Sequence, residues 1–143
     1  MPHKRLVIDA NILIRAVFGQ RVWELIAGAS EEVAFYVAEA NYQEACRYLA
    51  ELAPRRGISE AIWQESLATL MSAVQLVGQE ELALVEAEAR ARIAHRDVRD
   101  LDGVAAALLL NCPIWTEDQD FFGAGLPTWT TATVEIYLHS SAD

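Results

Sequence analysis

Four acidic residues at or near the ends of predicted apolar segments carry the clearest chemical signal in this sequence: Asp9, Glu44, Asp100 and Asp118. Brought together without matching Lys or Arg, four carboxylates would repel one another and would be costly to keep ionised. A hard divalent cation removes that cost, and Mg²⁺ or Mn²⁺ prefers oxygen ligands of this kind. The residue types therefore predict a divalent-cation site, provided that the fold gathers these residues in one place.

Two polar residues stand beside these acids and could orient ligands or waters: Asn11, two residues after Asp9, and Thr116, two residues before Asp118. The histidines lie outside these positions, which argues against zinc; they are His3, His95 and His139. A carboxylate-held Mg²⁺ can activate water and stabilise the charge that develops during in-line attack on a phosphodiester. The predicted chemistry is therefore metal-assisted cleavage of a phosphodiester bond.

Each carboxylate also has a purely structural interpretation. Asp9 would cap a helix that begins two or three residues later, and Asp100 or Asp102 would cap the helix that follows them. Glu44 alone fits a solvated helix surface, and Asp118 fits a turn together with its polar neighbours. Only the joint pattern of the four acids favours a metal site over these separate roles.

The elements that must position these residues follow an alternation of short β-rich runs and longer helical runs. Strands are predicted at residues 6–8, 33–37, 74–77, 114–116 and, as a fifth, 128–130. Helices are predicted at 12–28 with a break near Gly19, at 42–53, from an N-cap at Ser59, at 79–93, at 102–110 and at 134–138. This alternation indicates an α/β sandwich around a mostly parallel sheet of four to five strands.

All four acids map to one edge of such a sheet. In an open parallel sheet, ligands bind in the crevice beyond the carboxyl ends of the strands. Asp9 and Asp118 follow the first and fourth predicted strands. Glu44 lies in the first turns of the helix after the second strand, and Asp100 immediately precedes the helix at 102–110. We therefore expect the four side chains to converge, although they are far apart in the sequence.

Composition and charge bound the class of protein. The 143 residues, of which 53% are hydrophobic and 22% charged, fit one folded domain over residues 1–143 rather than a disordered chain. A net charge of −10 argues against a protein that holds nucleic acid by bulk electrostatics, but not against an enzyme that reaches phosphates through a metal. Four arginines either line a substrate path beside Asp100 or keep a helix surface soluble: Arg90, Arg92, Arg96 and Arg99.

The expected compartment follows from the cysteines and the apolar runs. No apolar run is long enough to span a membrane, and the N-terminus has no apolar core of a signal peptide. Cys46 and Cys112 form neither a C-x-x-C nor a zinc pattern, so we expect two reduced thiols. The sequence therefore predicts a cytoplasmic protein without a membrane partner.

Several segments resemble PIN-domain ribonucleases. Residues 7–13, VIDANIL, are similar to the opening of that family, and residues 42–45, YQEA, have an acid where the family has one after its second strand. Residues 100–110, residues 113–118, PIWTED, and residues 120–121 resemble its closing half. The resemblance covers nearly the whole chain. It is strongest to the PilT N-terminus type, which is counted among the VapC-like toxins of type II toxin–antitoxin modules.

The resemblance implies a small three-layer α/β/α sandwich with a central parallel sheet. It implies Mg²⁺- or Mn²⁺-dependent endonucleolytic cleavage of single-stranded or structured RNA. It also implies a homodimer held in check by a small antitoxin protein, whose basic segment would place Arg or Lys against the acidic pocket. Carried over by position, the catalytic and metal-binding site consists of Asp9, Glu44, Asp100 and Asp118, with Asn11 and Thr116 as polar support.

The assignment of one acid depends on spacing. Three aspartates lie close together, Asp97, Asp100 and Asp102, and Asp100 is chosen because it stands sixteen residues before Thr116. Asp97 is kept as a supporting residue. Asp120 is another supporting residue, because it could share the role of the acid two residues before it.

The main alternative is a non-catalytic PIN-like module for protein binding or oligomerisation, and the four intact acids speak against it. A receiver-like phosphoacceptor domain would need adjacent acids after the first strand and an Asp after the third, where this chain has Ala10, Gly78 and Gln79. A haloacid-dehalogenase-type phosphatase would need Asp-x-Asp after the first strand, where this chain has Asn11. The prediction is therefore a metal-dependent endoribonuclease, the toxin of a toxin–antitoxin pair.

Overall fold

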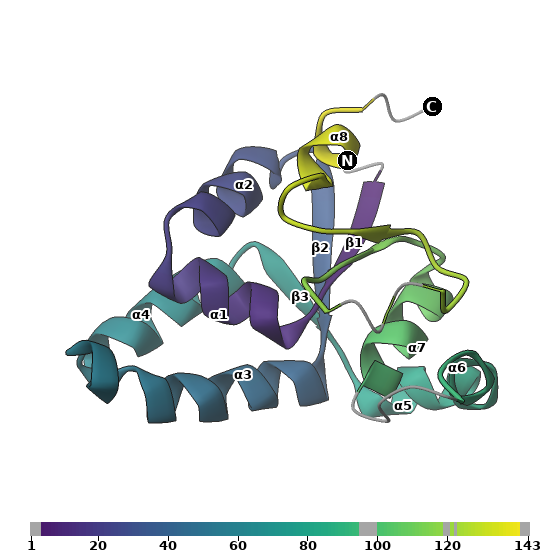
Figure 1. Cartoon of the computed structure of the whole chain (residues 1–143), viewed down its shortest axis with the longest axis horizontal. Helices are drawn as coiled ribbons and strands as arrows, with labels where there is room; N and C mark the ends of the chain where they lie inside the picture. Colours follow the sequence, from purple (N-terminus) through teal and green to yellow (C-terminus); the bar gives the residue numbers. More distant parts are fainter. Residues whose placement is uncertain (1–3, 95–99, 119–120, 122, 141–143) are drawn as a thin grey trace.

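A five-stranded parallel sheet runs through the centre of the described chain, in the strand order β3-β2-β1-β4-β5 (Figure 1). The computed structural model describes residues 4–94, 100–118, 121 and 123–140. The strands are β1 Lys4–Ile8, β2 Val33–Ala38, β3 Val74–Val77, β4 Ile114–Trp115 and β5 Thr128–Trp129. Every neighbouring pair is parallel. The predicted α/β class and parallel sheet are confirmed, and the fifth strand is present.

Helices cover both faces of the sheet, which gives three layers (Figure 1). Residues of five helices share one apolar core with the first face: α1 Ala10–Phe18, α2 Arg21–Ala29, α3 Glu39–Leu52, α4 Glu60–Met71 and α8 Val134–Leu138. Residues of three helices share a second core with the other face: α5 Gln79–Leu82, α6 Glu86–Arg92 and α7 Leu101–Leu110. Two short 3₁₀ turns, η1 Pro54–Arg56 and η2 Ala83–Val85, complete the described elements.

The last three residues of β1 and both residues of β4 are apolar and buried, because helices cover both faces of the sheet there. In β1, Leu6 and Ile8 belong to the first core and Val7 to the second. Ile114 and Trp115 of β4 divide in the same way. Successive side chains of a strand point to opposite faces, so a sheet covered on both sides needs apolar residues at every position.

The prediction of one continuous helix at residues 79–93 is wrong. The structure has α5, the turn η2 and α6 in its place. Leu82 is buried in the second core while Leu84 is 77% exposed, and Val85 leaves the helical conformation with φ −121° and ψ 13°. The 3₁₀ turn sets residues three apart on one side, which lets both Leu82 and Val85 pack against the second core.

Other predicted boundaries shift by a few residues or hold. The first helix begins at Ala10, because Asp9 rather than a later residue is its N-cap. Ser59 caps α4 as predicted, and its hydroxyl accepts a hydrogen bond from the Ile62 amide at 3.3 Å. The third strand spans the predicted residues, Val74–Val77.

Both cysteines, Cys46 and Cys112, are free thiols. Burial raises the pKa of the Cys112 thiol to about 11, so it stays protonated and unreactive near neutral pH. Within the described ranges, no helix combines the length and the apolar character needed to cross a membrane.

The strand order also fixes where a ligand site would form. From β1 the chain moves to one side of the sheet for β2 and β3, and then to the other side for β4 and β5. The order therefore reverses between β1 and β4. In open α/β sheets this reversal opens a crevice at the carboxyl ends of the two strands, which is where ligands bind.

Candidate active site

Asp9 stands at the reversal point, directly after β1, and both of its carboxylate oxygens are engaged. Oδ1 accepts a hydrogen bond from the Ala10 amide at 2.5 Å, which caps α1. Oδ2 accepts from the Thr116 hydroxyl at 2.7 Å and from the Asn11 side-chain amide at 3.0 Å. The helix-cap interpretation of Asp9 is therefore right for one oxygen, while the other belongs to a network that reaches the end of β4.

Thr116 and Asn11 join the ends of β1 and β4 around this carboxylate. Thr116 is fully buried, and its hydroxyl oxygen accepts from the Asp118 amide at 2.9 Å. The Asn11 side-chain oxygen accepts from the Glu117 amide at 3.4 Å. The two polar residues singled out beside the acids thus hold the backbone that carries Asp118 in a fixed relation to Asp9.

The electrostatic environment of Asp9 disfavours its charge. Burial raises the pKa of the Asp9 carboxyl, and the nearby Asp118 carboxylate raises it further. The hydrogen bonds from Thr116, Ala10 and Asn11 lower this pKa but do not outweigh burial. An ionised Asp9 therefore raises the free energy of the folded state, and a cation placed beside it would offset that cost.

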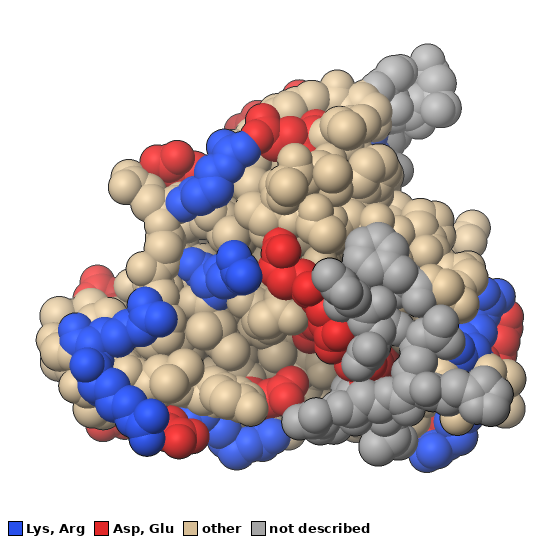
Figure 2. All heavy atoms as spheres, viewed as in Figure 1, with Lys and Arg blue, Asp and Glu red and all other residues tan. Residues whose placement is uncertain are grey.

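All four predicted acids line one cavity of about 300 Å³: Asp9, Glu44, Asp100 and Asp118. The other described lining residues are Ala10, Asn11, Ile14 and Tyr48, with no Lys or Arg among them. In the space-filling view, acidic side chains gather in the hollow at the centre of the molecule (Figure 2). We refer to this hollow as the acidic cavity.

Each acid reaches the cavity from a different element. α3 begins directly after β2, so Glu44, in its second turn, stays near the carboxyl edge of the sheet. Asp100 is 8% exposed and occupies the N-cap position of α7, but its side chain makes no capping hydrogen bond. The interpretation of Asp100 as a helix cap is therefore wrong, and its carboxylate lines the cavity instead.

The donor set fits a hard cation better than a closed metal cage. Among the described residues, no group of three His, Cys, Asp or Glu side chains is close enough together to hold a metal ion as it stands. Mg²⁺ usually keeps several waters and takes only one or two carboxylates from the protein, so it does not need such a cage. A carboxylate cavity of this size leaves room for those waters.

The remaining predicted residues lie elsewhere or outside the described ranges. Asp102 lines a different cavity of about 90 Å³ and accepts a hydrogen bond from the Gln79 side chain at 3.3 Å. Asp97, Asp120, His3, His95, Arg96 and Arg99 lie outside the described residues. The sixteen-residue spacing to Thr116 favoured Asp100 over Asp102, and of these two only Asp100 lines the acidic cavity.

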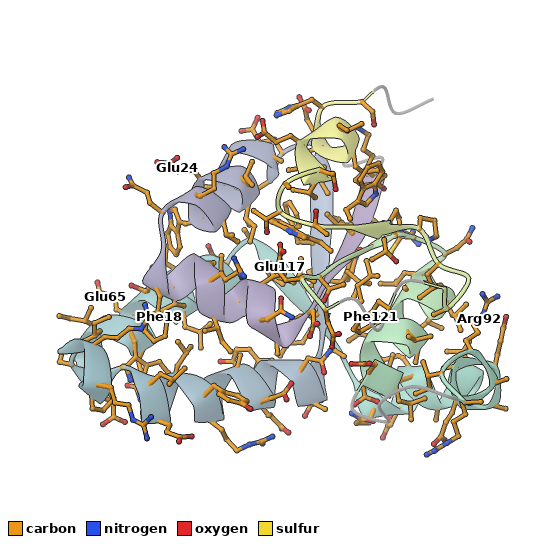
Figure 3. All side chains as sticks on the ribbon, viewed as in Figure 1. Phe18, Glu24, Glu65, Arg92, Glu117 and Phe121 are labelled. Atoms are coloured by element: carbon orange, nitrogen blue, oxygen red, sulfur yellow. The ribbon has the colours of Figure 1, made fainter. Side chains whose placement is uncertain are left out.

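The two described arginines of the predicted substrate path do not line the acidic cavity. Arg90 pairs with Glu86 at 2.7 Å, and Arg92 with Glu88 at 3.1 Å, on the surface of α6. Arg92 also donates to the carbonyls of residues 124 and 125 and lies at the edge of the molecule (Figure 3). For these two arginines the structure therefore supports the second interpretation, in which they keep a helix surface soluble.

Sequence reasoning missed Tyr48, which lines the acidic cavity with 44% of its surface exposed. Tyr48 stands four residues after Glu44 on α3, so both side chains lie on the same side of the helix. The i,i+4 spacing was the only sequence feature that linked Tyr48 to Glu44. It could be interpreted only once the structure showed where the cavity lies.

We predict that Thr116→Val lowers both stability and any activity of the site. Valine removes the hydroxyl that donates to Asp9 and accepts from the Asp118 amide, so two hydrogen bonds of these partly buried groups are lost. The free energy of unfolding should fall by about 1–3 kcal/mol, as measured by urea denaturation. Thr116→Ser, which keeps the hydroxyl, should lose less. Equal losses in the two variants would show that packing rather than the hydroxyl matters.

Comparisons with known proteins agree with this fold. The sequence profile of the PIN domain matches residues 7–139. Among solved structures, the crystal structure of PAE2754 from Pyrobaculum aerophilum is similar, with a TM-score of 0.71 and 18% sequence identity over 97% of this chain and 92% of that chain. At that identity the likeness shows the fold alone. No curated protein matches the sequence.

Proposed function

Because the chain belongs to the PIN domain family, we propose that it is an endoribonuclease that cleaves RNA phosphodiester bonds with the help of Mg²⁺ or Mn²⁺. PIN domains are generally nucleases and typically use divalent metals. The proposal adds RNA as the substrate and the acidic cavity as the active site. The observation that carries it is the meeting of four carboxylates from four separate segments of the chain in one cavity.

In this proposal, Asp9, Asp100 and Asp118 would hold the cation, and Glu44 would bind it directly or through water. When bound, a divalent cation supplies an activated water and stabilises the charge that develops on the phosphate. Thr116 and Asn11 keep the Asp9 carboxylate oriented through their hydrogen bonds at 2.7 and 3.0 Å. Tyr48, at the exposed side of the cavity, presents an aromatic ring on which a base could stack.

The experiment is an RNA cleavage assay with the purified chain in Mg²⁺, in Mn²⁺ and in EDTA. We predict cleavage with either metal and loss of cleavage in EDTA, because the proposed mechanism needs the cation to activate water and to stabilise the charge that develops on the phosphate. Re-addition of Mn²⁺ after EDTA should restore activity. Cleavage that persists in EDTA would overturn the metal-dependent mechanism. No cleavage with any metal would favour the alternative of a non-catalytic PIN-like module.

We further propose that the chain acts in the cytoplasm as the toxin of a toxin–antitoxin pair, as a homodimer. The support is the resemblance of its sequence motifs to VapC-like toxins, together with the acidic cavity. An antitoxin segment carrying Arg or Lys could form charge-assisted bonds to these carboxylates. Light scattering tests the dimer, and co-purification with the product of a neighbouring small gene tests the antitoxin. A strict monomer without such a partner would contradict this role.

A further inference from the structure

A second cavity, of about 530 Å³, lies where α1 ends, α2 begins and η1 follows α3. Three of its lining residues are arginines: Arg15, Arg21 and Arg56. Phe18 and Thr131 also line it, and among its described lining residues there is no Asp or Glu. We refer to this hollow as the basic cavity.

The basic cavity and the acidic cavity lie next to each other along one face of α1. Ile14 lines both cavities. Asn11, Ile14, Arg15 and Phe18 follow the i, i+3, i+4, i+7 spacing of a single helix face. From Asn11 to Phe18 the helix rises about 10 Å, so the two cavities lie within the reach of one short ligand. Figure 3 labels Phe18 on α1, and Figure 2 shows basic side chains beside the central acidic hollow.

The charge in the basic cavity stands out against the rest of the chain. The sequence has 11 Lys and Arg residues and a net charge of −10, yet three arginines line this one hollow. A local concentration of positive charge can attract a polyanion even when the whole molecule is acidic.

The three arginines differ in how much charge they can offer a ligand. Arg21 forms an ion pair with Glu135 of α8. The Arg56 guanidinium lies over the Phe18 ring, 4.4 Å from its centroid, which orients the group without neutralising it. Arg15 makes no ion pair with any acid in the described ranges. Arg15 and Arg56 are therefore the two lining arginines that form no ion pair with an acid in the described ranges.

We propose that the basic cavity binds the sugar–phosphate backbone of single-stranded RNA, next to a bond held in the acidic cavity, with Arg15 and Arg56 as positioning residues. This inference rests on the proposed nuclease function. Guanidinium groups bind phosphate oxygens in paired, directed hydrogen bonds. The acidic cavity has four carboxylates in its lining, so phosphate contacts in the neighbouring basic cavity would help to hold a negatively charged strand beside it.

Binding is measured by fluorescence anisotropy with the full chain, in EDTA to prevent cleavage. The probe is a labelled, unstructured RNA pool of random sequence, about 12 nucleotides long. Arg15→Gln and Arg56→Gln should each weaken binding about tenfold. Each should also reduce the slope of log K against log salt by about 0.7, as expected for the loss of one phosphate contact. Arg15→Lys, which keeps the charge, should bind RNA with a salt dependence close to that of the wild type.

Arg90→Gln is the matched control, because it removes one positive charge from an exposed helix surface outside both cavities. It should leave RNA binding within about twofold of wild type. In the cleavage assay, Arg15→Gln should raise KM and leave kcat unchanged, because the contact is present in both the bound substrate and the transition state.

Several outcomes overturn the inference. Equal losses in the cavity variants and in Arg90→Gln would mean that only bulk charge matters. Unchanged binding in Arg15→Gln and Arg56→Gln, or no RNA binding by the wild type, would remove the site. Arginine-dependent binding of a polyglutamate peptide without RNA binding would assign the cavity to an acidic protein partner. Arginine-dependent RNA binding without cleavage in any metal would instead keep this site and remove the nuclease function.

Discussion

Asp100→Asn is expected to reduce RNA cleavage at least 100-fold, whereas Asp102→Asn should retain most of it. Asp100 lines the acidic cavity and is almost fully buried, while Asp102 lines a separate hollow and bonds to Gln79. Asparagine keeps the shape of aspartate but removes a charged oxygen ligand, and the loss of a metal ligand costs more than the roughly 10–100-fold seen for outer residues. The measurement is the initial rate of RNA cleavage in saturating Mn²⁺.

Asp102→Asn is a close control, because it makes the same chemical change two residues away in the same helix turn. Asp9→Asn should match Asp100→Asn in its loss of activity. Asp97→Asn should have a smaller effect if the sixteen-residue spacing from Asp100 to Thr116 identifies the right acid. Full activity in Asp100→Asn, with loss in Asp97→Asn or Asp102→Asn, would show that another aspartate of this segment is the ligand.

The sequence was sufficient to predict the sheet and the position of two acids of the candidate site, for a physical reason. Strands buried on both faces must be apolar throughout, so the runs at β1 and β4 were recognisable without any contacts. An acid that follows such a run directly or within three residues is expected at the carboxyl edge of the sheet. The positions of Asp9 and Asp118 followed from that rule, and the cavity between them contains both.

Features that depend on packing between distant segments could not be predicted. The basic cavity joins residues 15, 56 and 131, and nothing in their separate surroundings marks them as neighbours. The break at η2 follows from the burial of Leu82 and Val85 against α7, which outweighs the helical propensity of residues 79–93. Both features arise from tertiary contacts that local sequence patterns do not record.

The second prediction with a large expected effect concerns stability and needs no substrate. Saturating Mn²⁺, at about 100 times its dissociation constant, should raise the free energy of unfolding of the wild type by about 2.7 kcal/mol through mass action. For a chain of this length, that corresponds to a rise in melting temperature of about 10 °C. Asp100→Asn should lose most of this rise, because it lacks one of the carboxylates that would bind the cation.

The behaviour in EDTA follows from the pKa of Asp9. A carboxyl whose pKa is raised in the folded state binds its proton more tightly there than in the unfolded state, so ionisation of Asp9 lowers stability as the pH rises through that pKa. At neutral pH, Asp9→Asn removes the free-energy cost of the buried charge. However, the new side-chain NH2 group would face the Asn11 amide, which donates to Oδ2 in the wild type, so two donors would oppose each other. These effects oppose each other, so the melting temperature of Asp9→Asn in EDTA should differ little from that of the wild type.

Asp100→Asn in EDTA should melt at the wild-type temperature or slightly above it, because its side chain makes no capping bond to α7 and its charge adds to the repulsion in the cavity. Thermal melts of the three proteins, each with EDTA and with Mn²⁺, separate a metal site from a purely structural role. If the acids only cap helices, asparagine replaces them at little cost and metal changes none of the melts. A wild-type melt that is indifferent to both Mn²⁺ and Mg²⁺ would remove the metal site, and with it the proposed nuclease mechanism.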